Sequence, residues 1–154
     1  MRDKFNIAII SCYEFTDQII LCLKEDGIKL KELSQPMAIF EAIMSLSPRY
    51  VPDTKDSRSF PGVILDMVKY PVEMLALPAG DCDDFTTLYA ACLVSIGRGV
   101  ALITIPEHIF LAFDTNIHSK HKGLFNLFEG SYLELDDHIW IPMELTKTSS
   151  SSIL

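Results

Sequence analysis

The chain has 154 residues, of which 49% are hydrophobic and 22% are charged, and its formal net charge is −8 at pH 7. This length and composition predict one globular domain with a hydrophobic core rather than a disordered chain. The negative charge and the lack of a basic stripe argue against nucleic acid and anionic membrane surfaces as default partners.

No targeting or membrane-spanning segment is visible in the chain. The opening stretch MRDKFNIAIISCYEF holds an apolar run too short for a signal-peptide core, and no later run reaches transmembrane length. We expect a soluble protein with no membrane segment, cytoplasmic by default, unless the chain is a piece of a longer exported or anchored protein.

The N-terminal third is expected to be mainly helical. FNIAIISCYEF reads as a short buried strand or as the start of a helix, and QIILCLKEDG reads as a helix ended by Gly27. Thr16 or Asp17 would cap that helix. Cys12 and Cys22 lie in apolar surroundings typical of small core residues.

A clearer helix follows in SQPMAIFEAIMSLSP, with Ser34 or Gln35 as its cap and Pro36 in its first turn. Its apolar side chains fall on one stripe: Met37, Phe40, Ile43 and Met44. YVPDTKDSRSFPG has the composition of a loop. YPVEMLALPAG predicts a short helix that begins at Pro71 and stops before Pro78.

The strongest helical pattern begins at Cys82. Asp81 is a natural cap, Cys82 is then the first helical residue, and Gly97 supplies the stop. Apolar side chains recur at spacings of three and four: Phe85, Leu88, Tyr89, Cys92, Leu93 and Ile96.

Four apolar runs then predict strands, and these runs are VALITIP, HIFLAFD, SYLEL and HIWIPMEL. Pro106-Glu107 and Asp136-Asp137 separate them as turns between antiparallel strands would. Helices followed by strands predict an α+β domain in which the helix carrying Cys82 packs on an antiparallel β-sheet.

Cys82 is placed where a thiolate would be stabilised, because free N–H groups and the helix dipole favour negative charge at a helix start. The alternative reading is an unreactive buried cysteine near a cap. Nucleophilic thiol chemistry also needs a base and a group that orients it. His108, at the start of an apolar strand, is the best candidate base among the four histidines. Glu144 lies on a neighbouring apolar strand, where a carboxylate buried without a hydrogen-bonding or charged partner would be costly.

The other polar clusters have simpler readings. His118 and His121 lie in the polar stretch NIHSKHKG, and their spacing would suit a metal only in a helix, while His138 follows a turn. Asp81, Asp83 and Asp84 have the pattern of caps more than of a Ca²⁺ site, which needs six to eight oxygens.

Three blocks, taken in order, carry a resemblance: GDCDDFTTLYAACLVSIG, PEHIFLAF and WIPMELT. Together with the preceding segment YPVEML, they resemble the transglutaminase-like superfamily, and in particular its bacterial members. The resemblance spans residues 50–146 and implies a papain-like core. It implies Cys82 as nucleophile, His108 as base and Glu144 as orienting acid, with no metal and no cofactor.

The resemblance also implies the function. We expect cysteine-dependent acyl transfer at an amide of a protein or peptide substrate, through a thioester, with peptide or isopeptide hydrolysis favoured over cross-linking. The core would span residues 49–147, with residues 1–48 packed on it and residues 148–154 as a disordered tail. Glu107 stands where relatives usually carry Gly, and Glu144 where Asp is commonest. The alternatives are a non-catalytic binding or interaction module, possibly part of a larger protein, and a purely structural domain.

Overall fold

The computed structural model describes residues 31–52, 67–128 and 132–146. The expected strand or helix in FNIAIISCYEF, the expected helix ended by Gly27, and Cys12 and Cys22 lie outside these residues. Most of the expected loop in YVPDTKDSRSFPG and the expected tail 148–154 also lie outside them.

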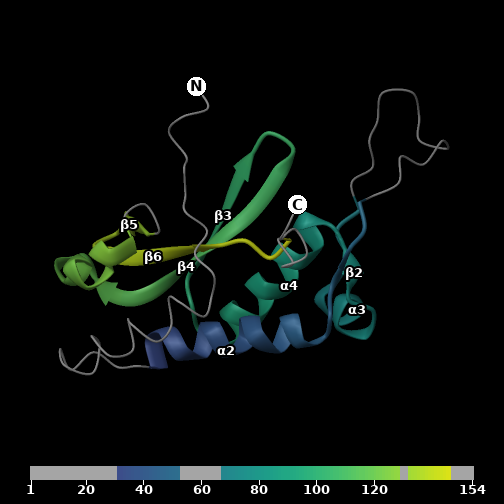
Figure 1. Ribbon diagram of the computed structural model, residues 1–154, viewed down its shortest axis with the longest axis horizontal. Coiled ribbons are helices and arrows are strands. Elements are labelled where there is room, and N and C mark those ends of the chain that lie inside the picture. The colour runs from purple at the N-terminus through teal and green to yellow at the C-terminus, as the bar shows by residue number, and fades with distance from the viewer. Residues whose placement is uncertain (1–30, 53–66, 129–131, 147–154) are drawn as a thin grey trace, which may run out of the picture.

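The described chain is an α+β fold in which helices pack on a curled antiparallel sheet (Figure 1). The helices are α2 (Lys31–Ser45), α3 (Pro71–Ala76) and α4 (Cys82–Ser95), with a 3₁₀ segment, η1 (Ser119–Phe128). The strands are β1 (Arg49–Tyr50), β2 (Ala79–Gly80), β3 (Val100–Ile105), β4 (His108–His118), β5 (Leu133–Leu135) and β6 (His138–Met143).

The larger sheet has the order β3-β4-β6-β5, and all its neighbours are antiparallel. Its two expected turns are present, at residues 106–107 and 136–137. Pro142 of β6 faces Ala112 of β4, and β5 pairs with β6 only over residues 138–140. Proline is tolerated there because its missing N–H falls on the unpaired side of the strand.

The core forms where α4 packs between β4 and α2 (Figure 1). Four side chains of the expected stripe on α4 are buried: Phe85, Leu88, Tyr89 and Leu93. The Tyr89 hydroxyl donates to the carbonyl oxygen of Pro36 at 3.0 Å, and its ring meets Phe40 edge to face. Ile96 was expected on this stripe, but it is the residue that follows the helix and is 39% exposed.

The cap expected for α2 at Ser34 or Gln35 is wrong, because residues 31–35 are already helical and Pro36 lies inside the helix. Proline lacks the N–H that an interior position donates, so sequence reasoning places it in the first turn. Tertiary contacts hold the additional residues in the helix. Leu33 is buried in the core, and Glu32 forms a salt bridge with the buried side chain of Arg98.

Two other elements differ from expectation. The expected strand HIFLAFD continues to His118. Its pairing with β6 shifts register between Asp114 and His118, and Asn116 has a positive φ there. The alternation of inward and outward side chains is therefore interrupted, so the sequence pattern does not reveal the second half of the strand. The parallel β1–β2 pair was missed, because strands of two residues carry no periodic signal. None of the described helices combines the length and apolar character needed to cross a membrane.

Candidate active site

Cys82 is the first residue of α4, as expected from the cap at Asp81. Asp81 has extended backbone angles, and its N–H donates to a carboxylate oxygen of Asp84 at 3.3 Å. Free N–H groups at this end of the helix favour negative charge. The thiol is half-buried, so a substrate could still reach it.

The Asp84 carboxylate stabilises the turn between β2 and α4, which positions Cys82. Its side chain is 1% exposed and accepts hydrogen bonds from the backbone N–H groups of Lys69, at 2.7 Å, and Asp81. The Lys69 ammonium forms a salt bridge with the same carboxylate. The Asp84 charge is therefore neutralised within the turn, and the carboxylate is oriented by these donors.

Gly80 permits this packing. A Cβ atom at Gly80 would lie 2.2 Å from Oδ2 of Asp84, which is closer than any real contact of this kind. Glycine is thus required sterically at position 80, because a side chain there would block the approach of the Asp84 carboxylate to the backbone before Cys82.

His108 is the first residue of β4, and its ring stacks on Phe110, with 6.1 Å between ring centroids. Ring atom Nε2 is hydrogen-bonded to Oε2 of Glu144. The side chain of His108 is 27% exposed and that of Glu144 is 8% exposed. The contact expected between these two residues is therefore present, while their catalytic roles stay predictions.

Glu144 lies one residue beyond β6 and is fixed from its other side by Thr146. Its Oε1 accepts hydrogen bonds from the Thr146 backbone N–H at 2.8 Å and from the Thr146 hydroxyl at 2.6 Å. Burial raises the pKa of Glu144, but the Thr146 and His108 hydrogen bonds outweigh it and hold the pKa below its ordinary value. Thr146 was missed by sequence reasoning, although a hydroxyl two residues after an acid is a common local partner.

The first turn of α4 lies against the His108 end of β4. Thr86, one helical turn after Cys82 on the same face, is buried, and its hydroxyl donates to the carbonyl oxygen of Ile109 at 3.3 Å. The N-terminal half of α4 and the start of β4 are therefore in contact, and these two segments carry Cys82 and His108. Within the described part of the chain no hydrogen bond joins them. Because Nε2 is engaged by Glu144, ring atom Nδ1 is the nitrogen left to face a thiol.

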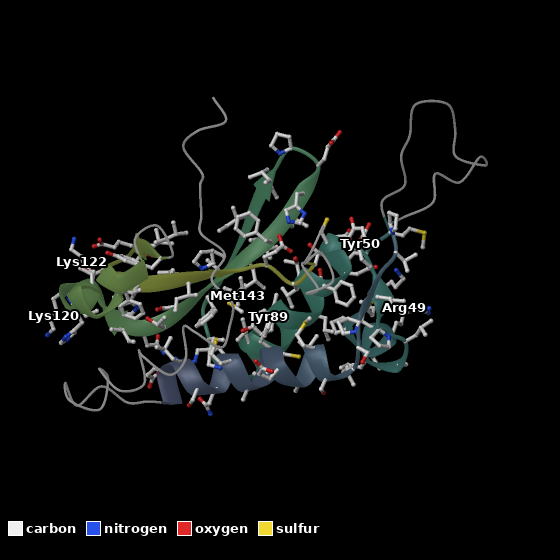
Figure 2. All side chains as sticks on the ribbon, in the orientation of Figure 1. Arg49, Tyr50, Tyr89, Lys120, Lys122 and Met143 are labelled. Carbon is white, nitrogen blue, oxygen red and sulfur yellow. The ribbon has the colours of Figure 1, made fainter. Side chains whose placement is uncertain are left out.

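Tyr50 is a further residue at this end that sequence reasoning placed only in a loop. It pairs with Gly80 in the β1–β2 ladder, and Figure 2 shows it beside the N-terminal end of α4. Partial burial raises the pKa of its hydroxyl, and negative charge at Cys82 raises it further. The carboxylates that add to this effect are Asp81, Glu144 and Asp83.

The other histidines lie away from this site. His118 pairs with His138 at the far end of β4, ten residues from His108. His138 Nδ1 is 2.8 Å from Asp114 Oδ2, and His118 Nδ1 accepts from the Lys120 N–H at 3.1 Å. Figure 2 shows Lys120 and Lys122 at the end of the molecule opposite Tyr50. His118 and His138 therefore belong to a cluster of polar side chains that is separate from the Cys82 thiol.

The three aspartates around Cys82 lie close enough to share a cation, with ligand atoms within 4.8 Å of one another. The hydrogen bonds of Asp83 and Asp84 nevertheless serve the helix start. Asp83 Oδ1 accepts the Asp84 N–H at 2.7 Å, and the Lys69 ammonium already lies on Asp84. Such an arrangement is typical of acids that cap a first turn.

Comparisons of the chain with protein-family models, curated proteins and solved structures find no match. The resemblance to the transglutaminase-like superfamily therefore depends on this chain's own residues and their arrangement.

Proposed function

We propose that this protein is a cysteine-dependent acyl-transfer enzyme with a transglutaminase-like, papain-related core. Cys82 is its nucleophile, His108 its base and Glu144 the acid that orients the base. The observation that carries the proposal is the His108–Glu144 hydrogen bond, because it fixes one ring nitrogen on a buried carboxylate at the end of β4 against which α4 packs. An activated thiol needs a base that a third group orients, and this contact supports such a pairing of His108 with Glu144.

The hydrogen bond to Glu144 occupies Nε2 of His108, which leaves Nδ1 as the ring nitrogen that can accept a proton. With its Nε2–H donated to Glu144, neutral His108 takes the Cys82 proton at Nδ1. The thiolate attacks the amide carbonyl carbon, a C–S bond forms, and the carbonyl oxygen becomes an oxyanion. The C–N bond then breaks, and His108 returns the proton to the leaving amine. Water attacks the thioester with His108 again as base, which releases a carboxylic acid and restores the thiol.

The Cys82 backbone N–H is one donor for the oxyanion, because the first N–H groups of a helix have no partner within it. Glu144 supports the imidazolium that forms, and its lowered pKa keeps it ionised near neutral pH. Peptide or isopeptide hydrolysis is favoured over cross-linking, since water needs no second binding site. The described residues supply every group in these steps.

An acyl-enzyme assay tests this proposal. Native protein is treated briefly with p-nitrophenyl acetate near neutral pH, and the acetylated residue is located by mass spectrometry. We expect the acetyl group on Cys82 in the native protein and none at this position in Cys82→Ser under the same brief treatment. Cys92 is a built-in control, because burial raises the pKa of its thiol. Acetylation of Cys92 as fast as that of Cys82 would contradict the proposal.

The second candidate is a non-catalytic binding module that keeps the fold. The observation that favours it is a set of exposed apolar side chains on β1, on α3 and on the residues just before α3: Tyr50, Val51, Met67, Val68, Tyr70 and Val72. This candidate predicts an unreactive Cys82, so the acyl-enzyme assay separates the two.

A further inference from the structure

Tyr50 is held near Cys82 by backbone pairing rather than by its own side chain. It is the Cα partner of Gly80 in the parallel β1–β2 ladder, two residues before Cys82. The flanking hydrogen bonds are short: the Arg49 N–H donates to Pro78 at 2.9 Å, and the Val51 N–H donates to Gly80 at 2.7 Å. The position of the Tyr50 Cα is therefore fixed relative to the start of α4.

The direction of the Tyr50 side chain follows from this register. Residues paired across a ladder project to the same face of the sheet. A Cβ at Gly80 would point directly at the Asp84 carboxylate, in the first turn of α4. Tyr50 therefore projects to the face on which that turn, and Cys82 with it, lies.

The Tyr50 hydroxyl is a donor with no assigned task. Within the described residues it makes no hydrogen bond, and the side chain is 51% exposed. Its pKa is raised by partial burial and then by the charges of Cys82, Asp81, Glu144 and Asp83. A raised pKa keeps the phenol protonated, so it can donate at any pH at which the thiol would work.

We propose that the Tyr50 hydroxyl is the second donor to the oxyanion that forms when Cys82 attacks a carbonyl. This inference rests on the proposed function and adds a catalytic residue to it. A neutral donor suits this site, because Asp81, Asp83 and Glu144 would disfavour an oxyanion that only water solvates. The hydroxyl and the Cys82 backbone N–H would bind the same oxygen from two elements, β1 and α4.

A peptide aldehyde tests the assignment without a known substrate. Its carbonyl adds the Cys82 thiol, so that a C–S bond forms and the aldehyde oxygen takes the oxyanion position and gains the thiol proton. The probe is acetyl-Phe-glycinal, and its affinity is read as protection of Cys82 from iodoacetamide. Tyr50→Phe removes only the hydroxyl. Tyr132→Phe is the matched control, since Tyr132 lies outside the β1–β2 ladder and its ring packs on Phe125.

We expect Tyr50→Phe to weaken aldehyde binding by about 10-fold, the value of one hydrogen bond to the neutral adduct oxygen. Tyr132→Phe should bind the aldehyde like the unmodified protein. Equal affinity for Tyr50→Phe and the unmodified protein would overturn the role of Tyr50 and leave the proposed function intact. If the unmodified protein forms no adduct, the proposed function fails and this inference fails with it.

A second measurement checks the placement independently. The phenol absorbance of Tyr50 is isolated as the difference between the unmodified protein and Tyr50→Phe during an alkaline titration. Cys82→Ala removes the thiolate charge, so we expect the pKa of Tyr50 to fall in that background. An unchanged Tyr50 titration in Cys82→Ala would show that the hydroxyl does not lie in the field of the thiol.

Discussion

Glu144 is held on both of its carboxylate oxygens, one by His108 and the other by Thr146. In the proposed triad, this arrangement lets a Glu take the place that the resemblance most often gives to a shorter Asp. The carboxylate begins one residue past the end of β6, and the two Thr146 donors fix its orientation. The longer side chain thus still reaches the His108 ring.

Glu144→Gln should keep the fold and slow Cys82 alkylation near neutral pH. The amide fits the same volume but gives the imidazolium no counter-charge, so less thiolate forms at equilibrium. Iodoacetamide labelling followed by mass spectrometry measures the rate, with Cys92 as internal reference. An unchanged Cys82 rate across the pH range would remove Glu144 from the mechanism.

The lowered pKa of Glu144 also predicts how stability depends on pH. A carboxyl whose pKa is lower in the folded than in the unfolded state stabilises the fold above its unfolded pKa. That contribution is lost as pH falls from about the ordinary value of 4.5 through the lowered folded value. Urea unfolding should therefore show the stability difference between native protein and Glu144→Gln shrinking below pH 4.5. A difference independent of pH would contradict the assigned hydrogen bonds.

Glu107 adopts a positive φ of 63° in the turn before His108. A non-glycine residue there costs about 1–2 kcal/mol, partly offset by the entropy that glycine loses on folding. We expect Glu107→Gly to stabilise the protein by about 0.5–1 kcal/mol. Asp137→Gly is a matched comparison, because Asp137 has a φ of 60° in the other expected turn. Destabilisation by both changes in urea unfolding would contradict this account.

Glu107 also bears on substrate choice. Its carboxylate is exposed beside the first residue of β4, so we predict a preference for substrates with a basic group near the scissile amide. Profiling Glu107→Gly against a peptide library should show a weaker preference with turnover retained. An unaltered preference would assign the selectivity to other residues.

At the scale of the element, the start of α4 depends on the contact between Gly80 and Asp84. Gly80→Ala places a methyl group 2.2 Å from the Asp84 carboxylate, so the β2–α4 turn must shift. We expect a loss of stability of about 1–3 kcal/mol, typical of overpacking, together with slower Cys82 labelling. Gly99→Ala is a milder comparison away from the β2–α4 turn, since its Cβ would lie 3.2 Å from Asp114 and Trp140 and would require only a small shift. Native-like labelling and stability of Gly80→Ala would show that this turn does not position the thiol.

Elements with a strong local signal could be predicted from sequence, and those set by tertiary contacts could not. The cap at Asp81, the stop at Gly97, the start of α3 and both hairpin turns are encoded by residues with strong backbone preferences. The helical residues of α2 that precede the expected cap depend instead on the burial of Leu33 and on the Glu32–Arg98 pair. Contacts between residues far apart in sequence cannot be predicted from a local sequence pattern.

At the scale of the whole molecule, the candidate site is assembled from three parts of the fold. The β1–β2 ladder brings Tyr50, α4 brings Cys82, and the β4–β6 pairing brings His108 to Glu144. Sequence pointed to the last three residues through the resemblance of the blocks that hold them, and two of these residues begin a recognisable element. It missed Tyr50 and Thr146, since one depends on a two-residue ladder and the other on a side-chain contact beyond a strand.

The central claim is that His108 activates Cys82, and the pH profile of Cys82 alkylation in native protein tests it most directly. His108→Ala is the test variant, and His138→Ala is the control because His138 pairs with Asp114 instead. We predict that native protein and His138→Ala label Cys82 ahead of Cys92 at about pH 6 to 7. His108→Ala should label Cys82 rapidly only at alkaline pH. Superimposable Cys82 profiles for native protein and His108→Ala would contradict the account.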